Sequence, residues 1–103
     1  MHNLINLKGY HSILCLNGDL PDSTFFLNMD LPIIAADGAA DTLLDLGIRP
    51  TLIIGDLDSV RPYTLKQYPF LHLPDQESND YQKAMHYLRN NDLLPAIITG
   101  ING

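Results

Sequence analysis

Two aspartates stand two residues apart in the segment Gly55-Asp56-Leu57-Asp58-Ser59, directly after the apolar run at 52–54. Side chains at positions i and i+2 of a strand point to the same side, so a strand continuing through this segment would bring Asp56 and Asp58 together. Two carboxylates held that close repel each other. A hard cation such as Mg²⁺ would remove this conflict, because it prefers oxygen ligands and usually brings phosphate groups with it.

Five short apolar runs and four helix-like segments alternate along the chain and must position these carboxylates. The runs cover 12–17, 32–36, 52–54, 70–73 and 96–99, and the helix-like segments cover 23–29, 39–46, 61–68 and 79–91. Short continuous runs of this kind are typical of strands buried on both faces. Asn79, with Gln82 three residues later, has the capping-box spacing that marks the start of a helix. The alternation predicts an α/β fold, a three-layer Rossmann-like domain with a mostly parallel sheet of about five strands flanked by helices.

Aspartates follow four of the predicted strands, namely Asp19, Asp37, Asp56 and Asp75. The carboxyl ends of parallel strands share one edge, and ligands of open α/β sheets bind in the crevice at that edge. Any one of these acids is explained by the frequency of aspartate in turns and before helices. The four together, with Asp58 added, favour a metal site.

Two further segments have both a functional and a structural interpretation. Gly38 would let the backbone approach a ligand, and the helix start after it suits phosphate, but Asp-Gly is also an ordinary turn sequence. Asp80 lies in the first turn of the helix predicted at 79–91, and Lys83 is three residues on, so both share one face. They are either a dipole-favoured acid with a local ion pair, or a metal-site carboxylate with a phosphate-contacting cation.

Composition sets outer limits on the function. The 103 residues suit one domain, and a hydrophobic content of 46% allows a real core. The net charge of −6 argues against nucleic-acid binding through a basic patch. The single cysteine, Cys15, lies in an apolar run, so no disulfide can form within the chain and a reduced, cytoplasmic setting is expected. We expect no membrane association, because no apolar stretch reaches transmembrane length and no signal-peptide pattern is visible.

The remaining candidate residues carry weaker signals. His2, His11, His72 and His86 show no metal-ligand spacing, and we expect them to be structural or exposed. The chain has neither a Walker A sequence nor a G-x-G-x-x-G motif, so any ATP binding must use another arrangement.

In this order and with these spacings, the motifs resemble those of thiamine pyrophosphokinase. The matching residues are 36–40, Pro50, 55–59, Asp75, Gln76, Asn79, Asp80, Lys83 and Ala84, which span nearly the whole chain. Asn79 departs mildly, since many members carry Thr there and both residues cap helices. The ending departs more, because the family continues after a glycine-rich turn like 99–103 with an Arg/Asp/His segment, further strands and a β domain. We therefore interpret 1–103 as the N-terminal catalytic α/β domain without the C-terminal β domain.

The resemblance implies a Mg²⁺-dependent transfer of pyrophosphate from ATP to the hydroxyl of thiamine, giving thiamine diphosphate and AMP. It implies that Asp56, Asp58 and Asp80 hold Mg²⁺ and that Lys83 acts with them in catalysis. The nucleotide and diphosphate site would be lined by Asp37, Gly38, Asp56, Ser59, Gln76, Asn79 and Lys83. One of the carboxylates could also take the proton of the attacking hydroxyl, and the residues do not distinguish which. The family works as a homodimer, with thiamine bound where the α/β domain of one subunit meets the β domain of the other.

Two alternatives to this enzyme stay open. The chain could be a non-catalytic module that binds Mg²⁺ and a nucleotide without turnover. It could also be an α/β domain whose acids only cap helices and turns.

Overall fold

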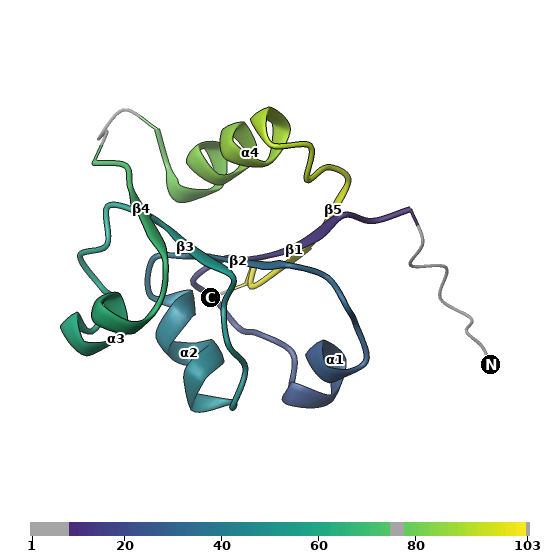
Figure 1. Cartoon of the computed structure of the whole chain (residues 1–103), viewed down its shortest axis with the longest axis horizontal. Helices are drawn as coiled ribbons and strands as arrows, with labels where there is room; N and C mark the ends of the chain where they lie inside the picture. Colours follow the sequence, from purple (N-terminus) through teal and green to yellow (C-terminus); the bar gives the residue numbers. More distant parts are fainter. Residues whose placement is uncertain (1–8, 75–77, 103) are drawn as a thin grey trace.

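The computed structural model describes residues 9–74 and 78–102 (Figure 1). The strands are β1 (Ser12–Cys15), β2 (Ile33–Ala36), β3 (Leu52–Gly55), β4 (Phe70–His72) and β5 (Ala96–Thr99). The helices are α1 (Ser23–Leu27), α2 (Ala39–Asp45), α3 (Pro62–Gln67) and α4 (Asp80–Asn90). Each element that the sequence predicts is present, within a few residues of its expected bounds.

The five strands form one sheet in the order β4-β3-β2-β1-β5, and every neighbouring pair is parallel. In Figure 1, α1, α2 and α3 cover one face of the sheet and α4 covers the other. This division follows from handedness, because a right-handed crossover places its helix on the opposite face when the chain reverses its direction across the sheet. The chain reverses once, when α4 carries it from β4 back past β1 to β5. The three-layer α/β expectation is therefore confirmed.

The alternation of side chains along the strands divides the core into two clusters. Ile13, Ile33 and Ile53 belong to the cluster that includes buried residues of α1 and α2. The residues that follow them in sequence belong to the second cluster, with Ala84 and Leu88 of α4. Because both faces are covered, the strands read as continuous apolar runs, which is how the sequence revealed them.

Prolines open three of the strands. Pro32, Pro69 and Pro95 directly precede β2, β4 and β5, and their carbonyl oxygens accept hydrogen bonds from Ile13 N, Ile53 N and His11 N at 2.8–3.0 Å. Proline suits the first position of a strand, where its missing N–H costs no ladder bond.

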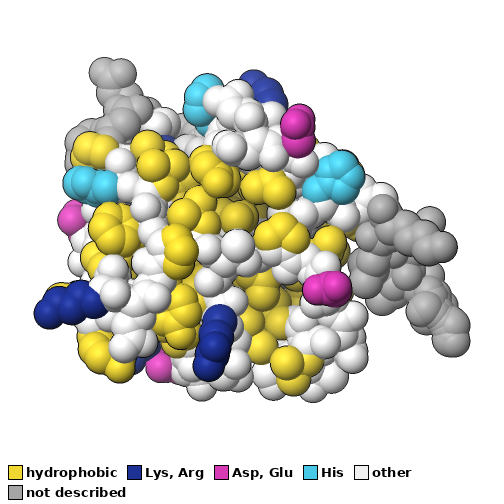
Figure 2. Space-filling view, in the orientation of Figure 1, with side chains coloured by type: hydrophobic (Ala, Val, Ile, Leu, Met, Phe, Trp, Pro, Cys, Tyr) yellow, Lys and Arg dark blue, Asp and Glu magenta, His cyan; other side chains and the backbone are white. Residues whose placement is uncertain are grey.

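Figure 2 shows hydrophobic side chains gathered on one side of the molecule, between α4 and the helices of the opposite layer.

The cysteine and the described histidines have the roles that the sequence predicts. Cys15 is buried, and burial raises the pKa of its thiol to about 11, so it packs in the core and is not an activated nucleophile. His11, His72 and His86 are exposed, whereas His2 lies outside the described residues. Of the helices in the part of the chain that the structure describes, none has the length and apolarity needed to cross a membrane.

Candidate functional site

The segment with the paired aspartates does not continue the strand before it. β3 ends at Gly55, whose φ is 131°, and Leu57 has a φ of 68°. Both values lie outside the extended region, so the expectation that Asp56 and Asp58 point the same way from one continuous strand is wrong. Instead, Asp58 N donates to Asp56 Oδ1 at 3.2 Å, so the Asp56 side chain closes a turn.

Asp37 links the end of β2 to this turn. It follows β2 directly, has a φ of 50°, and is 7% exposed. Its backbone N–H donates to Ile54 O at 2.9 Å, and its Oδ1 accepts from Ser59 N at 3.3 Å. Asp37 therefore joins the end of β2 to β3 through its backbone N–H and to the loop after β3 through its carboxylate. Asp37 and Ser59, both expected at the site, lie in direct contact.

Gly38 allows a close approach, but within the chain itself. A Cβ atom built at Gly38 would lie 3.1 Å from the Asn17 side chain, which comes from the loop after β1. The sequence analysis gave no role to Asn17. The signal that could have found it is its position, because it is a polar residue in the loop that follows a buried strand, as Asp37 follows β2.

The first turn of α4 brings a third acid to the same place. Gln82 N donates to Asn79 Oδ1 at 2.8 Å and Asn79 N donates to Gln82 Oε1 at 3.0 Å, so the predicted capping box is confirmed. This cap fixes Asp80 as the first residue of the helix. Asp80 Oδ1 lies only 3.3 Å from the position that a Cβ at Gly55 would take, and Asp37 N lies 3.6 Å from it. The missing side chain of Gly55 makes room for Asp80.

The electrostatics of Asp80 show which acids share this place. Burial raises the pKa of Asp80 above its ordinary value, the negative charges of Asp37 and Asp56 raise that pKa further, and Lys83 opposes them. The carboxylates that follow β2 and β3 therefore repel the carboxylate at the start of α4 across the carboxyl edge of the sheet. Asp58 is exposed at the rim of the same turn.

Lys83 is held at the edge of the site. It is 9% exposed, and its Nζ donates to Leu73 O, just after β4, at 2.7 Å. Its ammonium lowers the pKa of Asp80, so the two residues interact electrostatically, as their spacing on one helix face predicts. Two other expected residues, Asp75 and Gln76, lie outside the described residues.

The point where the strand order reverses, between β1 and β5, is bridged by backbone. Leu16 N donates to Thr99 O at 2.9 Å, and Asp19 N donates to Asn102 O at 2.5 Å. A Cβ at Gly18 would meet the carbonyl oxygens of Gly100 and Asn102, so this glycine admits the neighbouring loop. Asp37, Asp56 and Asp80, which interact electrostatically, lie to one side of this reversal point, after β2, after β3 and at the start of α4.

The donor set of this edge suits a hard divalent cation in its chemistry. Asp37, Asp56 and Asp80 supply carboxylate oxygens; burial and the charges of Asp37 and Asp56 raise the pKa of Asp80, and a cation would relieve this charge conflict. Among residues 9–74 and 78–102, however, no group of three or more His, Cys, Asp or Glu side chains is placed to hold a metal ion. Mg²⁺ commonly takes one or two carboxylates and completes its shell with water and substrate phosphates, so the residues present fit this ion.

A buried polar network behind the site was not found by sequence reasoning. Asp41 in α2 is 9% exposed and accepts from Arg61 N at 2.8 Å and from Thr64 Oγ1 at 2.7 Å. The signal available in the sequence is the four-residue spacing of Asp37, Asp41 and Asp45, which places them along one side of α2 and the turn before it.

Comparisons with known proteins agree with this fold. The family model described as thiamin pyrophosphokinase, catalytic domain, matches residues 26–103. Among solved structures, the chain is similar to thiamine pyrophosphokinase from Bacillus subtilis, with a TM-score of 0.69 and 24% identity over 89% of this chain and 48% of that one. It is similar to the enzyme from Geobacillus thermodenitrificans, with a TM-score of 0.70 and 21% identity over 87% and 46%. For yeast thiamin pyrophosphokinase the TM-score is 0.71, with 27% identity over 88% and 34%.

The chain spans about half the length of the two bacterial proteins and about a third of the yeast protein. No curated protein matches its sequence.

Proposed function

This chain belongs to the family of thiamin pyrophosphokinase catalytic domains, and from that membership we propose that it carries the ATP and Mg²⁺ site of an enzyme that pyrophosphorylates thiamine. The products would be thiamine diphosphate and AMP. The resemblance of the motifs at 36–40, 55–59 and 79–84 supports the same reaction.

One observation carries the proposal, which is the approach of Asp80 to Gly55. Asn79 and Gln82 already cap the start of α4 through the capping box. Asp80, the first residue of the helix, is therefore not needed as a cap. Yet Asp80 is partly buried, Asp37 and Asp56 repel it, and a Cβ at position 55 would crowd it at 3.3 Å. A structural role alone does not account for a partly buried carboxylate that two other carboxylates repel at the ligand-binding edge of a sheet. Phosphoryl-transfer sites commonly have this composition.

In the proposed mechanism, one or two of the carboxylates of Asp56, Asp58 and Asp80 would hold Mg²⁺, with water and phosphate oxygens completing its shell. Asp37 keeps the Asp56 turn in place through Ser59 N. When bound, the ion neutralises charge on the phosphates of ATP. Lys83 adds a positive charge at the same edge and is positioned by its bond to Leu73 O. Gln76 and Asn79 complete the proposed nucleotide and diphosphate site.

The transfer itself needs positioning more than covalent help from the protein. The hydroxyl oxygen of thiamine forms a bond to the β-phosphorus of ATP, while the bond from that phosphorus to the α–β bridging oxygen breaks and AMP departs. The hydroxyl proton goes to one carboxylate of the acidic set.

Formation of AMP from ATP in the presence of thiamine and Mg²⁺ tests this function. We expect Asp56→Asn and Asp58→Asn each to lower kcat by about a hundredfold, because each removes a charge that stabilises the transferring group. Asp30→Asn, in the exposed connection between α1 and β2, is the matched control and should keep full activity. Full activity in either site variant would refute the assignment.

A second candidate, which the residues leave open, is a module that binds Mg-ATP without turnover. Calorimetric titration with Mg-ATP, with and without thiamine, separates the two. Binding without AMP release would support the module for this chain.

The resemblance further supports a cytoplasmic, homodimeric full-length protein, with the second subunit contributing to the thiamine pocket. Sedimentation velocity tests the dimer, and a monomer at micromolar concentration would contradict it.

A further inference from the structure

Residues 56–61 form the loop that carries Asp56 and Asp58, here called the aspartate loop. Two of its backbone N–H groups donate hydrogen bonds to two carboxylates, one in α2 and one in the turn before it. Asp37, in the turn before α2, accepts from Ser59 N, and Asp41, one helical turn later, accepts from Arg61 N. The acceptors are four residues apart and the donors two residues apart. The loop that carries Asp56 and Asp58 is therefore attached along one side of α2 at two consecutive points.

The attachment at Asp41 is the more buried and the better satisfied. Asp41 Oδ2 accepts from Arg61 N at 2.8 Å, and Oδ1 accepts from Thr64 Oγ1 at 2.7 Å and lies 3.2 Å from Arg61 Nε. The Asp41 side chain is 13% exposed. Hydrogen bonds to an ionised acceptor are stronger than neutral ones, and the guanidinium compensates the buried charge.

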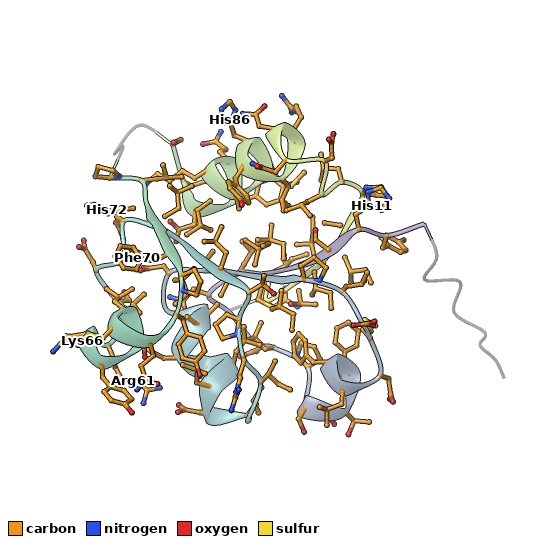
Figure 3. All side chains as sticks on the ribbon, viewed as in Figure 1. His11, Arg61, Lys66, Phe70, His72 and His86 are labelled. Carbon is orange, nitrogen blue, oxygen red and sulfur yellow. The ribbon has the colours of Figure 1, made fainter. Side chains whose placement is uncertain are left out.

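Arg61 completes the connection from its own side. Its Nη2 donates to the backbone Asp41 O at 3.1 Å and to Asp45 Oδ1 at 2.9 Å. In Figure 3 its side chain lies between α3 and α2. Arg61 is thus bound to α2 through its backbone N–H and through two nitrogens of its guanidinium, directly before the first residue of α3.

The aspartate loop needs such an attachment because its backbone is strained. Leu57 has a φ of 68°, a region that a leucine adopts only where the surroundings impose it. On one side the loop is held by the β3 ladder. On the other side it is held by Arg61 and Thr64, through Asp41.

We propose that Asp41 is a positioning residue that, through Arg61, holds the 56–61 loop in the conformation that aims the Asp56 and Asp58 carboxylates at the site. Asp41 itself touches neither ATP nor metal. The inference depends on the proposed function for the purpose of the loop, but the positioning can be tested without it.

The experiment compares Asp41→Ala with Asp45→Ala in the 103-residue chain labelled with ¹⁵N. Asp45 is the matched control, because its side chain is 68% exposed and contacts the same guanidinium without touching the loop backbone. In Asp41→Ala we expect hydrogen exchange at the Ser59 and Arg61 amides to become about tenfold faster, as loss of a hydrogen bond to a charged group implies. Exchange at Ser59 is decisive, since its own partner, Asp37, is unchanged.

The second measurement is the affinity for Mn²⁺ alone, from paramagnetic broadening. Removal of a group that orients metal ligands typically weakens binding by about tenfold or more, and we expect this loss in Asp41→Ala. Asp45→Ala should match the wild type. Ile48→Ala, a core substitution outside the loop, serves as a stability control and should also keep wild-type affinity.

The outcomes separate the two proposals. Unchanged exchange at Ser59 with unchanged Mn²⁺ affinity in Asp41→Ala would overturn the positioning role. A wild-type chain that binds no Mn²⁺ would count against the proposed function, while faster Ser59 exchange would still support the positioning. If Asp41→Ala fails to fold, Asp41→Asn decides, because it keeps one acceptor oxygen. The expected result is then an intermediate exchange rate, and wild-type exchange would overturn the inference.

Discussion

The two ends of the parallel sheet are built by opposite rules. At the amino end, Pro32, Pro69 and Pro95 lead into strands, and each carbonyl is satisfied by the neighbouring strand. The residues of left-handed backbone near this end, Gly47 with a φ of 82° and Asp92 with a φ of 58°, directly follow the ends of helices. Such residues are a usual way to finish a helix, and they store little strain.

At the carboxyl end, left-handed backbone follows strands. Asp37, Gly55 and Leu57 have φ values of 50°, 131° and 68°, and none of them ends a helix. Near the same few residues, burial and the charges of Asp37 and Asp56 raise the pKa of Asp80. Strain and unrelieved repulsion persist where the surroundings enforce them, and they gather at functional sites. Among the residues that the structure describes, strained backbone next to repelling carboxylates is found at the carboxyl end of the sheet.

Gly55→Ala should produce the largest effect. A side chain at a φ of 131° is strained, and its Cβ would lie 3.3 Å from Asp80 Oδ1. We expect the free energy of unfolding to fall by about 3 kcal/mol, the upper part of the range for an imposed backbone outlier. Urea denaturation followed by circular dichroism measures it.

Gly47→Ala is the matched control at the amino end. Its φ is also positive, but nothing lies within 4 Å of the added Cβ. Here we expect a loss of only about 1 kcal/mol, the intrinsic cost of left-handed backbone. Equal losses at the two positions would remove the distinction between the ends of the sheet.

The same contrast explains what the sequence could predict. Buried strands are visible in the sequence as apolar runs, and proline and capping residues mark where elements begin. The five strands and four helices of the described residues, and their parallel sheet, were therefore predictable. The strand order was not, because the apolar runs do not specify which strands lie next to each other. Inside the site, the capping box at Asn79 was predictable from local spacing.

The turn after β3 was not predictable. Leu57 adopts a positive φ against the usual preference of leucine, in a loop whose later residues make contacts to distant parts of the chain. Those contacts come from Asp37 and from Asp41 through Arg61, at separations of about twenty residues. A pattern of residue types contains no signal for such a connection, so the strand was extended too far and the Asp41 network was missed.

Asn79→Ala tests how firmly the carboxyl end holds its third acid. Loss of the capping box should lower the free energy of unfolding by about 1 kcal/mol and weaken Mn²⁺ binding, because the first turn of α4 carries Asp80. Asp22→Ala is the control: it removes the cap bond of α1, which is 3.4 Å long, and α1 carries none of the repelling acids. It should reduce stability less and leave Mn²⁺ affinity unchanged. Weaker Mn²⁺ binding in the control would contradict this reading.

Pro69→Ala tests the amino end. The alanine carbonyl can still accept from Ile53 N, so the ladder survives and the change acts mainly by loosening the unfolded chain. We expect a loss of about 0.5 kcal/mol in thermal or urea unfolding. Mn²⁺ affinity should equal that of the wild type. A change in affinity would mean that the amino end also shapes the site.

We expect the smallest effect from Asp80→Asn. It changes how the free energy of unfolding depends on pH. Burial and the charges of Asp37 and Asp56 raise the pKa of Asp80 above its ordinary 3.8, so the folded chain binds this proton more tightly than the unfolded chain. Ionisation therefore costs stability as pH rises from 3.8, until pH exceeds the raised pKa.

The asparagine variant lacks this penalty. In EDTA, urea unfolding between about pH 4 and about pH 7 should show the stability of the wild type falling relative to the variant as pH rises. Saturating Mn²⁺ at neutral pH should reverse the order, because a ligand that binds only the folded state stabilises it, and the wild type has the additional carboxylate. Parallel pH curves would mean that neither burial nor the charges of Asp37 and Asp56 raise the pKa of Asp80. The carboxyl end would then be as relaxed as the amino end, and the argument for a cation there would lose its physical basis.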